Sequence, residues 1–368
     1  MLGGLQYGSP CYIMVREYTM TKKILLGMST AELKLLAKEL GDKVFRGKQV
    51  ADWIYRHGCR QVNDMANLPA AFKMKMDESW EVGRSKIEKT SMGKDGTFKL
   101  LLRPYYGELV ETVGMLYDER FSCCVSTQVG CPVGCSFCAT GSGGFKRNLA
   151  AGEMVDQVLT VGQVAIKHKI LVPDGRVSHV VFMGMGEPLL NYEATLAAVR
   201  LINDELKIGM RNITISTIGY VPGIYRLAAE RLQLTLAVSL HAADDVLRRK
   251  LVPGMSRYLV KDILAACQHY YNHTGRRVTF EYCLLKGVND SQAEAATLAA
   301  LLKGLNCHVN LIPFNEVRQS NFRSPEPAGV VAFRRVLEEA GVTVTQREQR
   351  GAGIQAACGQ LRRQAASL

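Results

Sequence analysis

The sequence lacks any run of about 18 or more uncharged apolar residues, the length that a membrane-spanning helix needs. Its first twenty residues also lack a basic stretch followed by a continuous apolar core, so we expect no secretory signal. Glycine and proline are too scarce for a collagen-like or low-complexity chain, with 34 Gly and 11 Pro among 368 residues. These absences predict a folded cytoplasmic protein without a membrane span, in which residues 1–19 are an extension before Met20.

Acidic residues are in deficit: 34 Asp and Glu stand against 46 Lys and Arg, which gives a formal charge of +12. Such an excess suits a polyanionic partner such as nucleic acid or an anionic membrane surface, although a basic solvated surface would also produce it. Adjacent basic residues recur at Lys146-Arg147, Arg248-Arg249-Lys250, Arg276-Arg277, Arg334-Arg335 and Arg362-Arg363. Each pair alone suits a solvated helix face, and together they favour a basic surface for RNA.

Residues 20–98 have the pattern of a small helical domain. Ser29 and Glu32 have the spacing of a capping box, and apolar residues follow at helical intervals until Gly41. A second helical stretch runs near residues 48–60. Strand-like alternation begins near residue 97, so residues 99–119 are expected to form a linker with a β extension.

From residue 120 to 349, apolar β-rich runs alternate with helical stretches, which predicts an α/β fold. The expected strands are 122–125, 179–183, 212–217, 234–239, 278–285 and 309–313. The expected helices lie near 151–167, 192–206, 221–231, 260–273, 291–303 and 327–340. Six βα units predict a parallel sheet, either a partial barrel or an open doubly wound sheet. Functional residues should then lie at the C-terminal ends of the strands.

The sharpest motif among the eleven cysteines is a CxxxCxxC spacing formed by Cys131, Cys135 and Cys138, in the loop after the first of these strands. Three such thiolates can ligate three irons of a [4Fe–4S] cluster and leave the fourth iron open to a small molecule. A zinc site with a distant fourth ligand, or cysteines packed as small hydrophobes, would fit the spacing as well.

Small or polar residues follow four of the other strands, where a ligand could bind. They are Gly186, Glu187, Ser216, Ser239, Leu240, His241 and Asn315. Glycines allow a ligand to approach the backbone, and a carboxylate can accept a hydrogen bond from an ammonium group. Their expected position on one edge of the sheet carries more weight than any single residue.

The cysteine motif in the first βα loop resembles the signature of the radical S-adenosylmethionine (SAM) superfamily. Nearly the whole chain after residue 20 closely resembles the adenine-methylating RlmN/Cfr family within it. The stretches that carry this resemblance are Cys124 to Asn148, Gly184 to Pro188, Ser216-Thr217, Ser239 to His241, Asn310 to Asn315 and Arg350 to Leu361. The resemblance implies a radical SAM (β/α)6 partial barrel over 120–349, an RNA-binding accessory domain over 20–98, and a C-terminal segment, 350–368, with a catalytic cysteine.

The resemblance also implies the cofactors and the role of each residue. Cys131, Cys135 and Cys138 would hold one [4Fe–4S] cluster per chain, and the strand-end residues Gly186, Glu187, Ser216, Ser239, Leu240, His241 and Asn315 would bind SAM. Cys358 would accept a methyl group, Cys124 would resolve the resulting covalent intermediate through a transient disulfide, and Glu111 would act as the base. Two SAM molecules would be consumed per turnover, the second being cleaved to a radical.

The implied substrate is C2 of an adenosine in 23S ribosomal RNA, with an adenosine next to the transfer RNA anticodon as a second candidate. The implied electron donor is a protein such as flavodoxin, and the expected state is a monomer. Three alternatives stay open from the sequence. They are C8-directed methylation of the kind that confers antibiotic resistance, another radical SAM reaction, and a non-enzymatic RNA-binding protein with a structural metal.

Overall fold

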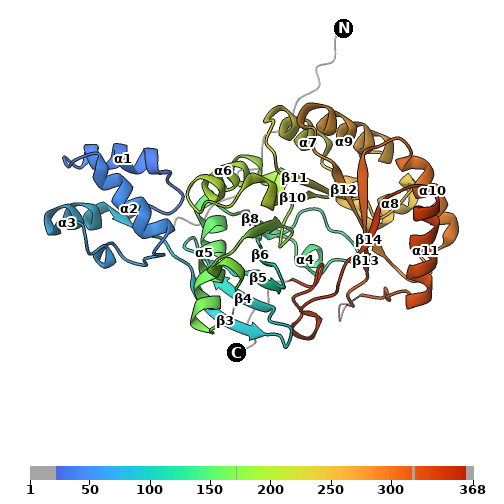
Figure 1. Ribbon diagram of the computed structural model, residues 1–368, viewed down its shortest axis with the longest axis horizontal. Coiled ribbons are helices and arrows are strands. Elements are labelled where there is room, and N and C mark those ends of the chain that lie inside the picture. Colours follow the sequence, from blue (N-terminus) through green and yellow to red (C-terminus); the bar gives the residue numbers. More distant parts are fainter. Residues whose placement is uncertain (1–21, 171, 317–319, 362–368) are drawn as a thin grey trace, which may run out of the picture.

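The computed structural model describes residues 22–361, apart from residue 171 and residues 317–319. Its centre is a ten-stranded mixed sheet in the order β14-β13-β12-β11-β10-β9-β6-β5-β4-β3. Figure 1 shows the sheet curving around an open interior, with helices on its outer side and three N-terminal helices to one side. Within the described residues, no helix is both long enough and apolar enough to cross a bilayer.

The predicted βα units are present, and the predicted α/β partial-barrel fold is confirmed. The parallel strands are β6 (Arg120–Cys124), β9 (His179–Phe182), β10 (Ile213–Thr217), β11 (Thr235–Ser239), β12 (Val278–Leu284), β13 (Cys307–Pro313) and β14 (Val344–Gln346). The helices between and beside them are α5 (Ala151–Lys167), α6 (Tyr192–Asp204), α7 (Val221–Ala229), α8 (Asp245–Leu251), α9 (Val260–Thr274), α10 (Gln292–Leu302) and α11 (Pro327–Glu339). The parallel connections require these helices, because a crossover must return the chain to the same end of the sheet.

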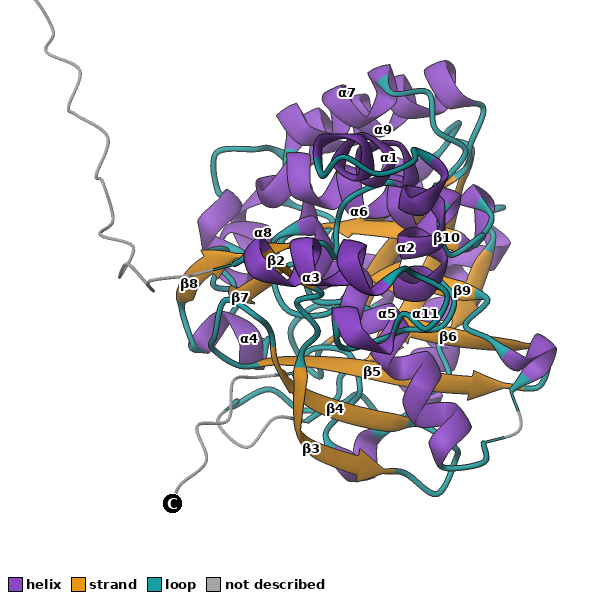
Figure 2. Ribbon diagram, turned by 90° about the vertical axis from the view of Figure 1, so that its left-hand side faces the viewer, coloured by secondary structure: helices purple, strands orange, loops and turns teal. Residues whose placement is uncertain are grey.

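The antiparallel side of the sheet holds β3 (Lys86–Met92), β4 (Phe98–Arg103) and β5 (Val110–Tyr117), which continues into β6 (Figure 2). Strands β4 and β5 lie where the sequence predicts a β extension. Strand β3 differs from the prediction, because it lies in the segment 20–98 that was expected to be helical. Its sequence is mostly polar and its residues are largely exposed at the sheet edge, so it lacks the apolar alternation that marks a half-buried strand.

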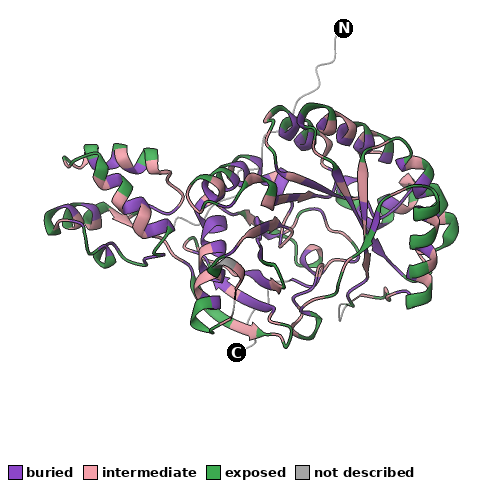
Figure 3. Cartoon of the chain, in the orientation of Figure 1, coloured by how far each residue is buried: buried purple, intermediate pink, exposed green. Residues whose placement is uncertain are grey.

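The N-terminal part consists of α1 (Thr30–Glu39), α2 (Phe45–Tyr55) and α3 (Ala70–Ser79), with short strands β1 (Lys23–Ile24) and β2 (Trp80–Glu81). The predicted capping box is confirmed, since the Ser29 side chain accepts from the Glu32 backbone and the Glu32 carboxylate accepts from the Ser29 backbone. The second helix begins three residues earlier than predicted and ends five residues earlier. Figure 3 shows that the outer faces of these helices are exposed.

Buried apolar residues connect the N-terminal helices to the sheet without interruption. One core cluster includes Leu33 of α1, Ile54 of α2, Phe98 of β4 and Tyr282 of β12. Arg84 adds a polar connection, because its guanidinium pairs with Asp156 of α5 and donates to the carbonyl of Gly58 at 2.7 Å. The N-terminal helices are therefore packed firmly onto the barrel.

We expect Arg84→Ala to lower the free energy of unfolding by about 3–5 kcal/mol, because it leaves the buried Asp156 carboxylate without its cation. Both side chains of the pair are 1% exposed, so solvent cannot replace the lost partner. Urea unfolding of the purified protein would measure the change. Arg335→Ala is the matched control, since it breaks an exposed pair with Glu339 on α11 and should leave the unfolding free energy nearly unchanged. Equal effects of the two substitutions would contradict the prediction.

Candidate active site

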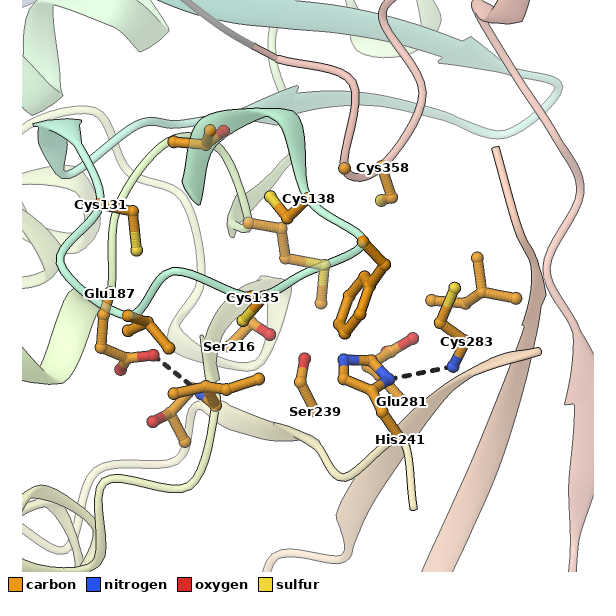
Figure 4. A pocket seen from close by; sticks show the side chains of 18 of the residues that line it. Cys131, Cys135, Cys138, Glu187, Ser216, Ser239, His241, Glu281, Cys283 and Cys358 are labelled. Carbon is orange, nitrogen blue, oxygen red and sulfur yellow. Dashed lines mark hydrogen bonds between the residues drawn. The ribbon is translucent and has the colours of Figure 1, made fainter. Parts of the chain in front are cut away.

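The three motif cysteines lie between β7 (Gln128–Gly130) and β8 (Phe145–Asn148), in the loop before the short helix α4 (Ala139–Ser142). Their side chains line one cavity of about 160 Å³ at the C-terminal ends of the parallel strands (Figure 4). Two backbone hydrogen bonds hold this loop from outside, Gly254 N–H to the Val133 carbonyl and Ser136 N–H to the Leu251 carbonyl, each at 3.0 Å. A side chain on Gly254 would collide with Val133, which explains the need for glycine at this close approach.

The cavity suits a group that supplies positive charge to the cysteine sulfurs. Burial raises the pKa of Cys131 to about 12 and the pKa of Cys135 well above its usual value. A thiol in such surroundings becomes a thiolate when a metal neutralises it. Among the described residues, no set of three or more His, Cys, Asp or Glu side chains is arranged to hold a single metal ion. Three thiols around one cavity at CxxxCxxC spacing fit the donor set of a [4Fe–4S] cluster.

Glu187 lines the same cavity close to Cys131, where the chain leaves β9 (Figure 4). Its carboxylate oxygens accept backbone N–H bonds from Ile218 at 2.8 Å and Leu189 at 3.1 Å. Burial raises the pKa of Glu187 to about 7, although the hydrogen bonds oppose that shift. Gly186, with φ +103°, lets the backbone turn into the cavity wall. A buried carboxylate in this position can receive a ligand's ammonium group.

The ends of β10 and β11 contribute Ser216, Ser239 and His241 to the same cavity. His241 has a left-handed backbone with φ +62°, and its Nδ1 accepts the backbone N–H of Cys283 at 3.0 Å. Leu240 does not line this cavity: its side chain is fully buried in the core, and its backbone N–H donates to the Glu281 carbonyl. Four strand ends thus meet around one space, while the proposed contact of Leu240 with a cofactor stays a prediction.

The buried His241 should make the protein less stable in mild acid. Burial, with a smaller contribution from the nearby Arg248 cation, lowers the His241 pKa from 6.5 to about 3. Below pH 6.5 the unfolded chain takes up a proton that the folded chain refuses, so stability falls by about 2 kcal/mol between pH 6.5 and 5.0. Urea unfolding at both pH values would measure this loss, and His241→Gln should remove it. An identical loss in the variant would show that other groups cause the pH dependence.

Cys358 approaches from the C-terminal segment and lines the cysteine cavity as well as a smaller one of about 30 Å³. The smaller cavity also holds Cys124, at the end of β6, and Asn315, just after β13. Asn315 donates from its amide to the Cys358 carbonyl at 3.0 Å, so it holds the Cys358 backbone and does not line the cysteine cavity. Burial raises the pKa of both thiols, and the nearby Arg347 cation opposes the rise. The structure therefore places the two proposed catalytic cysteines together.

Glu111 lies apart from both of these cavities. It lines a third space of about 310 Å³, together with Gln355 of the C-terminal segment. Its Oε1 is 2.9 Å from the Lys99 ammonium, and both side chains are buried. The structure thus places the proposed base next to the segment that carries Cys358, but not beside the Cys358 sulfur.

Three further residues around the thiols were not identified from the sequence. Glu281 and Cys283 of β12 line the cysteine cavity. Arg347 lines both cavities that Cys358 lines, and also a further space of about 510 Å³ along the parallel strands. Glu281 leaves a signal in the sequence, because a carboxylate interrupts an otherwise apolar strand. Arg347 leaves none, because it follows β14, whose three residues include only one that is buried.

The expectation that the paired basic residues form an RNA-binding surface is wrong for one of them. Arg248 was grouped with an RNA-binding surface, but it is buried and donates to the carbonyl of Ile218. Arg147 pairs with Glu153 at 2.8 Å, and Arg334 and Arg335 pair with glutamates on α11. Residues 362–363 lie outside the described residues. The expected basic surface therefore stays a prediction that rests on other residues.

Comparison with known proteins agrees with this site. Residues 125–299 match the model of the radical SAM superfamily, so the fold and the cysteine motif define a radical SAM protein. Residues 24–82 match the ribosomal RNA large subunit methyltransferase N-terminal domain. A solved radical SAM methyltransferase from Sphaerobacter thermophilus is 44% identical, with a TM-score of 0.88 over 93% of this chain and 99% of that one.

Two similar full-length relatives specify the family further. A probable dual-specificity RNA methyltransferase RlmN from Synechococcus sp. (strain CC9902) is 47% identical over 93% of this chain and 97% of its own length. Another protein of that name, from Thermosynechococcus vestitus, is 46% identical over 92% of this chain and 98% of its own length. The chain belongs to the RlmN family of radical SAM methyltransferases.

Proposed function

We propose that this protein methylates C2 of an adenosine in 23S ribosomal RNA and, as a second substrate, an adenosine in transfer RNA. The observation that carries the proposal is the meeting of Cys358 and Cys124 beside the three cysteines of the radical SAM motif. Family membership supports an RNA substrate, since the relatives are named as dual-specificity RNA methyltransferases. A one-electron donor such as flavodoxin would serve as the redox partner.

The chemistry explains why the chain needs two thiols in addition to the cluster ligands. C2 of adenine is an electron-poor sp² carbon, so it cannot displace the methyl group of a sulfonium by itself. Cys131, Cys135 and Cys138 would hold a [4Fe–4S] cluster, and Glu187, Ser216 and Ser239 would bind SAM. Together these groups would supply the methyl group for sulfur and the capacity to abstract a hydrogen atom. The Cys358 thiolate is the methyl acceptor, because sulfur is a competent nucleophile once it is deprotonated.

Cys124 then provides the route by which the modified base leaves the protein. Its thiolate attacks the Cys358 sulfur and the sulfur–sulfur bond forms. The bond from sulfur to the methylene carbon breaks with its electron pair moving into the base, and a proton from solvent then completes the methyl group. We propose that Glu111 accepts the proton that C2 must lose. A cellular thiol reductant then returns the disulfide to two thiols.

The test is methylation in vitro with anaerobically prepared, cluster-loaded protein, a one-electron reductant and SAM. Ribosomal and transfer RNA would be offered separately, and the methylated nucleosides would be identified by mass spectrometry. The expected product is 2-methyladenosine, with two SAM molecules consumed for each methyl group transferred. Formation of 8-methyladenosine would replace the proposed position by the C8 alternative, and unmodified RNA would contradict the methyltransferase assignment.

A further inference from the structure

The segment that carries Cys358 depends on other parts of the chain for its conformation. Between Gly351 and Leu361 its only regular element is the single turn η6 (Ala352–Ile354). Side chains and backbone groups from three distant regions bind it by hydrogen bonds. The contacts are Gly351 N–H to Asp95 Oδ2 (3.1 Å), Lys99 Nζ to the Gln355 carbonyl (2.9 Å), Asn315 Nδ2 to the Cys358 carbonyl (3.0 Å), Ala139 N–H to the Gly359 carbonyl (2.8 Å) and Thr140 Oγ1 to the Leu361 carbonyl (2.5 Å).

Lys99 differs from the other contacts because it connects the segment to a second buried charge. Its ammonium lies 2.9 Å from Glu111 Oε1 and 2.9 Å from the Gln355 carbonyl oxygen. Leu101 of β4 faces Glu111 of β5 in the sheet register, so Lys99, two residues before Leu101, lies diagonally across from Glu111 on one face. A buried ammonium needs several acceptors, and here the carboxylate and the carbonyl provide two of them.

A hydrogen bond from Lys99 to the Gln355 carbonyl should have a large effect on the position of Cys358. Gln355 has a left-handed backbone with φ +54°, which a residue with a side chain adopts only when its surroundings favour it. Cys358 follows three residues later, close to Cys124. Open space beside the contact, about 310 Å³ lined by Lys89, Ser91 and Gln355, gives the segment room to move if the contact is lost.

We propose that Lys99 is a positioning residue for Cys358. Anchored by Glu111, its ammonium holds the Gln355 carbonyl and thereby keeps Cys358 between the cavity that the cluster cysteines line and the smaller cavity that Cys124 lines. The catalytic meaning of this role rests on the proposed function of Cys358. The tether itself is a property of the folded chain and can be measured without turnover.

The decisive comparison uses Glu111→Gln and the double variant Lys99→Met/Glu111→Gln, both loaded with the cluster. The single variant keeps the Lys99 ammonium as donor to the Gln355 carbonyl, because the glutamine side-chain oxygen can still accept from Lys99 in place of the carboxylate. The double variant loses that contact but leaves no unpaired buried charge, so it should fold. Hydrogen–deuterium exchange followed by mass spectrometry should show amides of residues 351–361 exchanging at least about tenfold faster in the double variant. Peptides from β4 and β5 should exchange equally in both proteins.

Turnover gives a second measurement, which a general loss of stability would not reproduce. Lys99→Met should lower kcat about tenfold with KM for RNA unchanged, and it should slow methylation of the Cys358 sulfur by SAM, a step that does not use Glu111, by the same factor. Lys99→Arg should restore most of kcat, since a guanidinium can reach both acceptors. Lys89→Met, which removes a cation lining the same space, is the control that should leave kcat unchanged.

Equal exchange of residues 351–361 in the single and double variants would overturn the proposal, whatever the activity of the enzyme. The same is true if Lys89→Met and Lys99→Met lower kcat equally. Failure of the proposed function would look different: the natural chain would leave RNA unmethylated while the exchange difference persisted.

Discussion

Cys358→Ala is expected to reduce RNA methylation by at least about 10³-fold, because removal of a covalent nucleophile eliminates the step that it performs. The expected loss applies to both RNA substrates, since both would need the same methyl acceptor. Mass spectrometry of RNA nucleosides after incubation with SAM and reductant would measure it. Binding of RNA should persist, because the substitution removes one small side chain near the end of the described chain.

Cys283→Ala provides the matched control for this result. Cys283 lines the same cavity as Cys358 and is equally a free thiol, but it has no role in the proposed chemistry. Its backbone N–H, which donates to His241, is retained in the alanine variant. Similar losses in the two variants would show that filling of the cavity matters and that the Cys358 sulfur is not the methyl acceptor.

Cys124→Ala is expected to accumulate a covalent complex between protein and RNA. Without the second thiolate, the bond between Cys358 and the base has no route to cleavage, so the intermediate persists instead of turning over. Denaturing gel electrophoresis should show a protein band that migrates more slowly, and ribonuclease treatment should convert it to a faster-migrating band. Peptide mass spectrometry should locate the modification at Cys358. The complex should require SAM and reductant.

Cys123→Ala is the matched control for the Cys124→Ala experiment. Cys123 precedes Cys124 on β6, is fully buried and lies 3.7 Å from Thr112 Oγ1, on the opposite face of the strand from Cys124. Cys123→Ala should therefore release methylated RNA without accumulating the complex. Absence of a complex in both variants, together with normal methylation by Cys124→Ala, would eliminate Cys124 as the resolving cysteine.

The parallel half of the sheet could be predicted from the sequence because it is built from repeated, strongly apolar units. Strands β9 to β13 each carry buried apolar residues at every second position. They alternate with helices along the chain, so burial leaves a clear pattern in the sequence. The edge strands β3 and β14 could not be predicted in this way. Their residues are largely exposed, and their pairing partners, β4 and β13, determine their conformation.

The residues of the candidate site also fall into two groups. Local sequence patterns predict one group, and contacts between distant parts of the chain position the other. The cysteine motif and the strand-end residues are set by short spacings and by the rule that parallel strands end at one edge, and the structure brings most of them to one cavity. The positions of Glu111 and Asn315 depend on how the C-terminal segment folds back over the barrel. Lys99 could not be linked to the Cys358 segment from the sequence, because its contact with Gln355 joins residues 256 positions apart. Arg347 is near Cys358 in the sequence, but it follows an edge strand that is largely exposed, so no local pattern marks it.

The hydrogen bond from Ala139 N–H to the Gly359 carbonyl joins the cluster-binding loop to the segment that carries Cys358. Ala139 directly follows Cys138 on the loop, and Gly359 directly follows Cys358. We therefore expect occupancy of the cluster site and docking of the segment to be thermodynamically linked, so that each favours the other by the same factor. Oxidative loss of iron should then also loosen the segment and reduce the alignment of Cys358, the proposed methyl acceptor.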